Sequence, residues 1–197
     1  MLKIIKLNMS SLENTPAESR AKQNEEMVEN NRPPCVVDRY FKRRYKTDIL
    51  NKAGEDQLVL THSNRVCVIC LAASHPLIRE NKKITKVSFG EDKWNRLDNK
   101  FSGKSKRGAQ WLDATAPLCE VTCEDGSCYL LTCCVKGQLI EVNENLLKNP
   151  QLLTQKPQGE GYLAVILPGL KGFEREMSQL KTEEDYKLTL ANRVGNT

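Results

Sequence analysis

The stretch Gly137-Gln-Leu-Ile-Glu-Val-Asn-Glu-Asn-Leu-Leu-Lys-Asn-Pro150 decides the fold of this chain. It starts with a glycine and a run of strand-forming residues, and Asn143 can then leave the strand and cap a helix. Pro150 ends that helix, because proline lacks the backbone N–H that a helix needs and restricts the residue before it. We therefore predict a strand over Gly137–Val142 that passes directly into a short helix over Asn143–Asn149.

Short apolar runs bounded by Gly, Asn or Pro lie on both sides of this stretch. They are rich in Val, Ile, Leu and Cys, which is typical of short strands. We expect strands at Gln57–Thr61, Arg65–Leu71, Ile84–Phe89, Leu118–Cys123, Cys128–Cys134 and Gly161–Leu167. Between two of them, Glu124-Asp-Gly-Ser127 contains Asp-Gly, a strong signal for a tight hairpin. The pattern predicts a mainly β protein, an all-β sandwich or barrel.

A basic segment of helical character precedes the first strand. In Val36–Tyr45, Asp38 can cap a short helix whose apolar side chains lie close to one face. The outer face of that helix carries Lys42, Arg43 and Arg44. We expect a basic amphipathic helix that packs onto the core.

A second helix is predicted near the C-terminus, at Thr182–Arg193. Thr182 is suited to the N-cap, and the acidic residues of the first turn agree with the helix dipole. By contrast, Glu91–Lys100 has no clear period. We expect a loop there, anchored by Trp94 and Leu97.

Length and composition indicate one domain with tails. The 197 residues, 39% of them hydrophobic and 28% charged, are enough for one core. Residues 10–34 hold almost no large apolar side chains, so they cannot offset the entropy of ordering. We expect a disordered N-terminal tail at 1–34, a β domain at 35–172, and a C-terminal helix and tail at 173–197.

The net charge of +5 can be assigned to one part of the chain. Residues 1–34 carry five basic and five acidic side chains, and residues 173–197 carry four basic and five acidic ones, so these segments contribute 0 and −1. The remaining charge of +6 falls on residues 35–172. A positive core favours an acidic partner, either a protein or a nucleic acid, and ordinary solubility charge is the alternative.

No segment of the sequence resembles a membrane span or a leader peptide. Apolar runs stay well below the roughly 20 residues that a span needs. In Met1–Met9, Lys3 and Lys6 interrupt the apolar residues, and no small-residue cleavage site follows. We expect an intracellular protein that does not bind membranes.

The eight cysteines are expected to be free thiols, because a reducing compartment disfavours disulfides. Cys67-Val-Ile-Cys70 has the CxxC spacing, but residues three apart on a strand point to opposite faces, so metal binding is disfavoured. The adjacent pair Cys133-Cys134 also faces opposite ways on a strand. Cys119 and Cys123 share a face and can approach Cys128 across the hairpin, which leaves a redox or metal role there as an alternative.

Catalytic motifs are absent from the sequence. Neither His62 nor His75 lies in an HExxH motif or beside an acid–nucleophile arrangement. The run Gly103-Lys-Ser-Lys-Arg-Gly108 resembles a phosphate loop only superficially, since it lacks the required GKS/T ending. We predict that the protein is not an enzyme and uses no cofactor or metal.

The basic stretch between Lys100 and Gly108 is the second cationic feature. Two aromatic residues, Phe101 and Trp111, lie near its cations, one toward each end of the stretch. Such a loop can contact phosphates or an acidic protein surface, and a solvated turn is the alternative. Its cations are Lys100, Lys104, Lys106 and Arg107.

The stretch Gly137–Pro150 closely resembles the C-terminal part of proteins of the glycine-cleavage H-protein family. There, a strand Gly-x-(Leu/Val)-x-Glu-(Val/Ile)-Asn-Glu runs into a short helix closed by Asn-Pro. The matching residues here are Gly137, Leu139, Glu141, Val142, Asn143, Glu144, Asn149 and Pro150. Gly161-Tyr-Leu-Ala-Val-Ile166 resembles the closing Gly-Trp-Leu strand of that family, and Gly108 with Leu112 resembles its Gly-x-x-Leu step. The resemblance covers residues 60–167 and implies a barrel-sandwich hybrid, two small sheets packed face to face with short flanking helices.

One departure from that family bears on function. H-proteins and lipoyl domains present a lysine at a hairpin tip, because the swinging arm needs an amine to acylate. The equivalent hairpin here, Cys123-Glu-Asp-Gly-Ser-Cys-Tyr129, contains no lysine, and the nearest one downstream is Lys136. The carrier role is therefore expected to be lost.

A more specific resemblance is to the Abitram family, also called Simiate. The motifs that carry it occur in order over residues 36–167: Val37-Asp-Arg-Tyr-Phe41 with Tyr45, His62-Ser-Asn-Arg-Val-Cys-Val-Ile69, Ser74-His-Pro76, Ser102-Gly-Lys-Ser-Lys-Arg-Gly-Ala-Gln110, Ala116-Pro-Leu-Cys119 and Glu141-Val-Asn-Glu-Asn145. The resemblance implies an H-protein-like fold that binds actin as monomer and filament. It also implies roles in filopodium and dendrite growth, and in transcription modulation at nuclear speckles.

The resemblance yields a main hypothesis and two alternatives. The main one is a non-catalytic actin-binding regulator of the nucleus and of the cytoplasm, including actin-rich projections. Because actin is acidic, the expected contacts are Lys42, Arg43, Arg44, Lys100, Lys104, Lys106 and Arg107. Nuclear proteins, RNA or a second copy of the chain are further expected partners. The alternatives are a nucleic-acid-associated nuclear factor and a carrier in lipoate metabolism, which the missing hairpin lysine disfavours.

Overall fold

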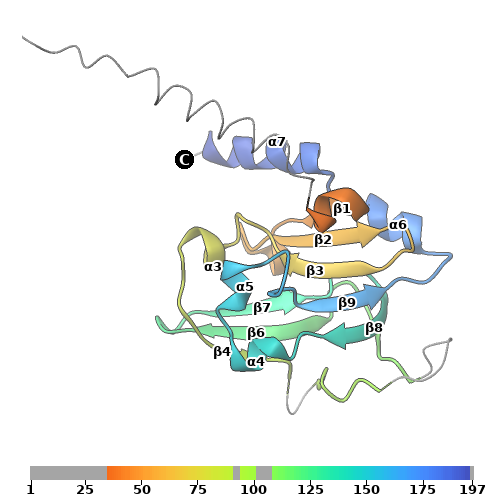
Figure 1. Ribbon diagram of the computed structural model, residues 1–197. Coiled ribbons are helices and arrows are strands. Elements are labelled where there is room, and N and C mark those ends of the chain that lie inside the picture. The colour runs from red at the N-terminus through yellow and green to blue at the C-terminus, as the bar shows by residue number, and fades with distance from the viewer. Residues whose placement is uncertain (1–34, 91–93, 101–107, 196–197) are drawn as a thin grey trace, which may run out of the picture. The chain divides into compact units, whose positions relative to one another are not determined.

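Two antiparallel sheets form the framework of residues 35–90, 94–100 and 108–195, which a computed structural model describes (Figure 1). The larger sheet has the order β1 (Phe41–Lys46), β2 (Gln57–His62), β3 (Cys67–Leu71), β9 (Ala164–Leu167), β8 (Gly137–Val142) and β5 (Trp111–Leu112). The smaller sheet has the order β4 (Ile84–Ser88), β6 (Pro117–Cys123) and β7 (Cys128–Thr132). The mainly β architecture of two small sheets with short flanking helices, predicted from the sequence, is confirmed.

The main core lies between the two sheets. Val59 and Ile69 of the larger sheet share one buried cluster with Val87, Val121 and Leu131 of the smaller sheet. Strand alternation explains why these residues join this cluster and their immediate neighbours along each strand do not, because successive side chains of a strand point to opposite faces. Complete burial of one such aliphatic side chain contributes about 1.5–3 kcal/mol, so this layer supplies most of the cohesion between the sheets.

The passage from β8 to the next helix follows the sequence prediction closely. β8 covers Gly137–Val142, and α4 covers Asn145–Lys148. Oδ1 of the buried Asn143 accepts from the backbone N–H of Asn145 at 3.2 Å, while its Nδ2 donates to the carbonyl of Glu160 at 2.7 Å. Asn143 therefore leads into the helix and also ties it to the chain before β9. A further short helix, α5 (Leu152–Gln155), follows Pro150.

The predicted helix over 36–45 is only half correct. Helix α2 covers Val36–Tyr40, and the chain then continues as β1, which pairs antiparallel with β2 from Phe41↔His62 to Lys46↔Gln57. The backbone hydrogen bonds offered by the edge of β2 outweigh the helical spacing of the apolar residues. Phe41 and Tyr45 reach the apolar outer face of the sheet by strand alternation instead.

Three smaller expectations also require correction. Leu97 is exposed, and among residues 94–100 the buried one is Arg96, whose Nε donates to the carbonyl of Pro117 at 2.9 Å. Cys133 and Cys134 follow the end of β7 and are buried in the same core, because Cys134 adopts a left-handed φ of 62° that breaks the alternation. Arg65, with φ 72°, likewise belongs to the turn before β3.

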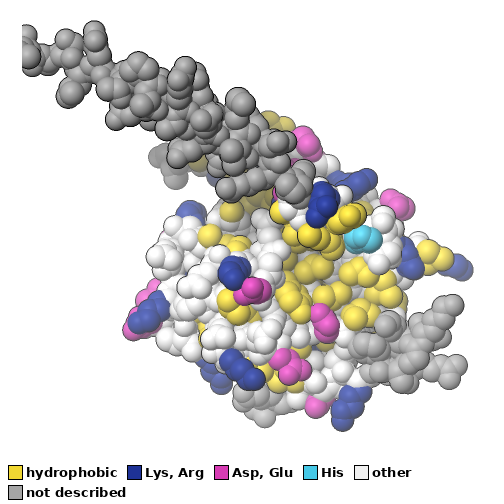
Figure 2. Space-filling view, viewed as in Figure 1, with side chains coloured by type: hydrophobic (Ala, Val, Ile, Leu, Met, Phe, Trp, Pro, Cys, Tyr) yellow, Lys and Arg dark blue, Asp and Glu magenta, His cyan; other side chains and the backbone are white. Residues whose placement is uncertain are grey.

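A second apolar cluster lies on the outer face of the larger sheet. It contains Leu58 and Leu60 of β2 and Cys70 of β3, together with Tyr186 of helix α7 (Glu183–Val194). Figure 1 shows α7 and the shorter α6 (Phe173–Ser178) beside this sheet, and Figure 2 shows hydrophobic side chains gathered on the face in view. The remaining short helices are α3 (Pro76–Arg79) and the 3-10 turn Ile49–Asn51. Each helix in the described ranges is too short or too polar to cross a bilayer.

Candidate binding site

The hairpin that carries the lysine in H-proteins is well formed here. It joins β6 and β7, and Gly126 takes a φ of 80° that suits glycine. Oδ1 of Asp125 accepts from the backbone N–H of Ser127 at 3.0 Å and from its hydroxyl at 2.6 Å. The predicted Asp-Gly hairpin is therefore confirmed, and its sequence presents no amine.

Two lysines reach this hairpin from the turn before β4, which the sequence did not predict. Nζ of Lys82 lies 2.6 Å from Oδ2 of Asp125, and Nζ of Lys83 lies 3.1 Å from Glu124. The hydrogen bond from Lys82 holds the pKa of Asp125 well below its usual range. Both amines are thus held in ion pairs with acidic side chains of the turn, and neither lysine belongs to the hairpin itself.

The cysteines that we considered for a redox or metal role do not converge. Cys119 and Cys123 are buried on the inner face of β6, whereas Cys128 is exposed and pairs with Thr122 across the hairpin. Cys67 belongs to the inner core and Cys70 to the outer cluster, so the CxxC pair does point to opposite faces. Within the ranges that the structure describes, no group of His, Cys, Asp or Glu is arranged to hold a metal ion.

The predicted contacts Lys42, Arg43 and Arg44 lie on β1 and are divided between its two faces. Lys42 is exposed, and Nη2 of Arg43 lies 2.6 Å from Oδ1 of Asp38 and 3.1 Å from the side-chain oxygen of Gln158. The hydrogen bond that Arg43 donates to Asp38 raises the pKa of Arg43. The surface hollow beside this strand is also lined by the acidic residues Asp38, Glu183 and Glu184. This patch therefore carries both signs of charge.

The second predicted patch can be placed only in part. Lys100 is exposed and follows Asn99, whose Nδ2 donates to the carbonyl of Leu139 in β8 at 2.8 Å. The other three cations, Lys104, Lys106 and Arg107, lie outside the described residues. The chain resumes at Gly108, three residues before Trp111 of β5.

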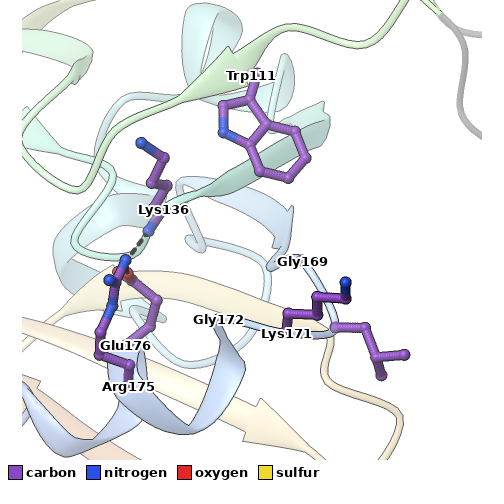
Figure 3. Close-up of a pocket in the computed structure, with 8 residues that line it drawn as sticks. Trp111, Lys136, Gly169, Lys171, Gly172, Arg175 and Glu176 are labelled. Carbon is purple, nitrogen blue, oxygen red and sulfur yellow. Dashed lines mark hydrogen bonds and ion pairs between the residues drawn. The ribbon is translucent and has the colours of Figure 1, made fainter.

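A recess of ≈ 450 Å³ opens beside Trp111 (Figure 3). The indole of Trp111 forms one wall, and the turn from Gly169 to Gly172, between β9 and α6, forms the opposite one. Trp111 is 53% exposed and Leu170 is 75% exposed, so two large apolar side chains meet solvent here. A Cβ added at Gly169 would lie 3.3 Å from the Trp111 ring, so glycine permits the close approach of this wall.

Cations surround the apolar part of the recess. Figure 3 shows Lys136 and Arg175 on one side and Lys171 on the other. Lys136 forms an exposed pair with Asp113, with Nζ 2.7 Å from Oδ1. Among the described residues that line the recess, the one carboxylate is that of Glu176.

Glu176 lies at the floor of the recess and bonds to neighbouring residues there. Its side chain is 8% exposed, and Oε2 accepts from the backbone N–H of Lys136 at 3.0 Å. Oε1 lies 3.8 Å from Nη2 of Arg175. The buried carboxylate is committed to these partners, and Asp113 pairs with Lys136, so the three cations of the rim outnumber the carboxylates beside it.

Sequence reasoning identified only part of this recess. It noted Trp111 as an aromatic next to a basic stretch and Lys136 as the first lysine after the hairpin. It missed Leu170, Lys171 and Arg175, because nothing in their local sequence indicates that the turn after β9 faces β5. The antiparallel pairing of β8 with both β9 and β5 brings them together.

Comparison with known proteins identifies the family. Protein Abitram of Xenopus tropicalis is 48% identical over 162 residues, which cover 82% of this chain and 88% of that protein. Protein Abitram of Homo sapiens is 46% identical over 165 residues, covering 83% of this chain and 91% of that protein. The chain belongs to the Abitram family.

The H-protein likeness of this Abitram-family chain is also supported. Residues 128–193 match the model of the glycine cleavage H-protein family. A crystal structure of a glycine cleavage system H protein from Mycobacterium marinum superimposes with a TM-score of 0.51 at 15% identity, covering 76% of this chain and 97% of that one. At this identity the superposition shows the fold alone.

Proposed function

We propose that this member of the Abitram family is a non-catalytic regulatory protein that binds actin, as monomer and filament. The observation that carries a binding role is the combination of a lysine-free carrier hairpin with an exposed apolar recess rimmed by cations. The hairpin offers no amine at its tip to acylate, whereas the recess and the exposed Lys42 and Lys100 offer a positive surface to an acidic protein. The actin assignment itself comes from the family resemblance.

The cellular role follows from the same resemblance. We propose that the protein acts in filament, filopodium and dendrite organisation in the cytoplasm and in transcription modulation at nuclear speckles. Both roles need the protein to bind partners without catalysing a reaction. The net positive charge of residues 35–172 favours binding to acidic partners.

Filament co-sedimentation tests the actin proposal with matched variants. The test variant carries Lys42→Glu, Arg44→Glu, Lys100→Glu and Lys104→Glu, which reverse two cations of each predicted patch. Arg43 is retained because it is bonded to Asp38 and Gln158. The control variant reverses four cations elsewhere, Lys83, Lys148, Lys156 and Lys187, and so has the same net charge.

The expected result is co-sedimentation of the native protein and the control, with at least a tenfold weaker affinity of the test variant at moderate salt. Equal loss in both variants would show that only net charge matters and would contradict the patch assignment. If the native protein stays in the supernatant with filaments and does not bind monomers, the actin proposal is wrong.

Direct nucleic-acid binding is the second candidate function. The exposed Trp111 ring could stack on a base, and Lys136 and Lys171 line the same recess and could contact phosphates. Titration with a labelled single-stranded RNA at two salt concentrations tests it. Micromolar or tighter binding that falls steeply with salt would favour this candidate over actin.

A further inference from the structure

The recess beside Trp111 differs from ordinary surface in its exposed apolar content. Leu170 lies in a four-residue turn, is 75% exposed, and is not part of either apolar cluster of the described chain. Trp111, on the shortest strand of the larger sheet, lines the same recess as Leu170. Large exposed apolar side chains that converge on a hollow are typical of sites that bind a partner.

The size and the walls of the recess suit one large side chain of a partner. Its volume of ≈ 450 Å³ falls in the roughly 300–1,000 Å³ range of ligand-binding pockets. The Trp111 ring and Leu170 give it apolar sides, and the glycines at 169 and 172 add no side chain to the wall opposite the ring. An isoleucine, leucine or phenylalanine side chain would exclude water from these walls.

The charges of the rim define the rest of the ligand. Lys136, Lys171 and Arg175 border the recess on two sides, and the carboxylate of Glu176 is buried against the Lys136 backbone. A peptide segment with carboxylates on both sides of its apolar residue would place one carboxylate near Lys136 and Arg175 and another near Lys171. Charge complementarity therefore selects an acidic segment over a basic one.

A peptide fits these walls better than a nucleic acid. The Trp111 ring has the Gly169 backbone close against it, so that part of the ring is not free for a base. The polar side chains that line the recess are three cations and one buried carboxylate, and none is an amide or hydroxyl suited to reading a base edge.

We propose that the Trp111 recess binds an acidic peptide segment of a partner protein, with one large apolar side chain between Trp111 and Leu170 and flanking carboxylates against Lys136, Lys171 and Arg175. This inference rests on the proposed role as a partner-binding protein and assigns that role to one surface. It does not depend on the partner being actin.

Tryptophan fluorescence of the full chain tests the proposal directly. The chain has two tryptophans, and a Trp94→Phe background leaves Trp111 as the reporter while it keeps an aromatic ring beside Arg96. The probe is the peptide Gly-Asp-Glu-Phe-Asp-Glu-Gly. The comparison peptides replace its Phe by Ser, or its four acidic residues by Lys.

The expected result is a blue shift of Trp111 emission with the acidic Phe peptide, and at least tenfold weaker binding of both comparison peptides. Leu170→Ser and the pair Lys171→Glu with Arg175→Glu should each weaken binding at least tenfold. Because Leu170 is exposed, Leu170→Ser should keep the native unfolding midpoint. Arg175→Glu removes a 3.8 Å contact of the buried Glu176, so the unfolding midpoint of the charge-reversed pair is measured as well, and only binding data from folded protein are compared. The control pair Lys148→Glu with Lys187→Glu, of equal charge change, should bind as the parent does.

Two results would overturn the inference. One is equal binding of the Phe and Ser peptides, or of the acidic and basic ones. The other is tight, salt-dependent binding of an oligothymidylate that quenches Trp111, which would identify the recess as a nucleic-acid site.

Filament co-sedimentation of the native protein, compared with its peptide binding, separates this inference from the proposed function. Peptide binding without any filament binding by the native protein would uphold the recess and reject actin. Filament binding without peptide binding would reject the recess and leave actin binding to the basic patches.

Discussion

The guanidinium of Arg193, in the last turn of α7, forms a two-point ion pair with the carboxylate of Asp56, which lies 137 residues earlier and is wholly buried. Nη1 donates to Oδ2 at 2.6 Å, and Nη2 donates to Oδ1 at 3.1 Å. Ser74 and Tyr186 also donate to Oδ2, at 2.8 and 3.1 Å. Burial alone would raise the pKa of Asp56, but these bonds hold it below its usual value. This network fixes the C-terminal helix to the outer face of the larger sheet.

Removal of the Arg193 side chain should therefore destabilise the fold. In Arg193→Ala, the buried Asp56 carboxylate loses its counter-ion, which typically costs about 3 kcal/mol. The free energy of unfolding, measured by urea denaturation at pH 7, should fall by about that amount. Adding Asp56→Asn should recover part of the loss, because an amide carries no charge to leave unpaired.

A matched control for this prediction lies on the same helix. Lys187→Ala breaks an exposed pair with Glu183, in which the lysine is 72% exposed, and should change stability by less than about 0.5 kcal/mol. If Arg193→Ala is as mild as this control, Asp56 must be satisfied without Arg193.

The buried His75 should make stability depend on pH. Its Nδ1 accepts from the backbone N–H of Leu77, its Nε2 is buried without a partner among the described residues, and burial lowers its pKa to about 4. Between the unfolded pKa of about 6.5 and this value, only the unfolded chain binds the proton, so stability falls as pH falls. We expect a loss of about 2 kcal/mol between pH 7 and pH 5.

His75→Asn provides the control for that titration, because its side-chain oxygen can still cap α3 but does not ionise. Urea denaturation of this variant should show a smaller change between pH 7 and pH 5 than the native protein shows. An unchanged pH dependence would assign the effect to another group.

Thiol labelling should separate the cysteines into two classes. Six are buried and two, Cys35 and Cys128, are exposed. Burial raises the pKa of Cys67 and Cys70 to about 12, which suppresses the reactive thiolate. Titration of the native protein with a disulfide reagent at pH 8 should give two fast thiols, and addition of denaturant should give eight.

Cys128→Ser should reduce the fast class to one thiol, which Cys35 supplies. Rapid native labelling of four or more cysteines would mean that the two-sheet core opens far more readily than its packing indicates.

The carrier hairpin should not accept a lipoyl group. Co-expression with a lipoate ligase, followed by intact mass measurement, should show unmodified protein, because Glu124–Ser127 contains no lysine and Lys82 is held by Asp125. An H-protein expressed in parallel serves as the positive control. An added lipoyl mass on this chain would restore the carrier alternative.

The local features of the fold could be predicted from the sequence because they depend on near neighbours. Asn143 leads from β8 into α4, Gly126 permits the hairpin turn, and Thr182 caps α7 by accepting from the N–H of Asp185. Each of these depends on backbone geometry within a few residues. The cysteine faces at 67 and 70 followed from strand alternation in the same way.

The Val36–Tyr45 segment shows where such reasoning fails. Its apolar spacing is helical, yet Phe41–Lys46 forms a strand because β2 supplies partners for its backbone. The competing hydrogen bonds come from residues that are distant in sequence, so no local pattern reports them.

Local sequence predicted most of the strands, the hairpin, the absence of a hairpin lysine and the positive charge of residues 35–172, but it predicted neither β1 nor β5. By contrast, the shared recess of Leu170, Lys171 and Arg175 with Trp111, and the burial of Asp56 beside Arg193, arise from the packing of distant segments. The physical reason is that capping, turn and alternation preferences act between neighbours along the chain. Both of these sites instead join side chains from segments that meet only when the sheets and the C-terminal helices pack.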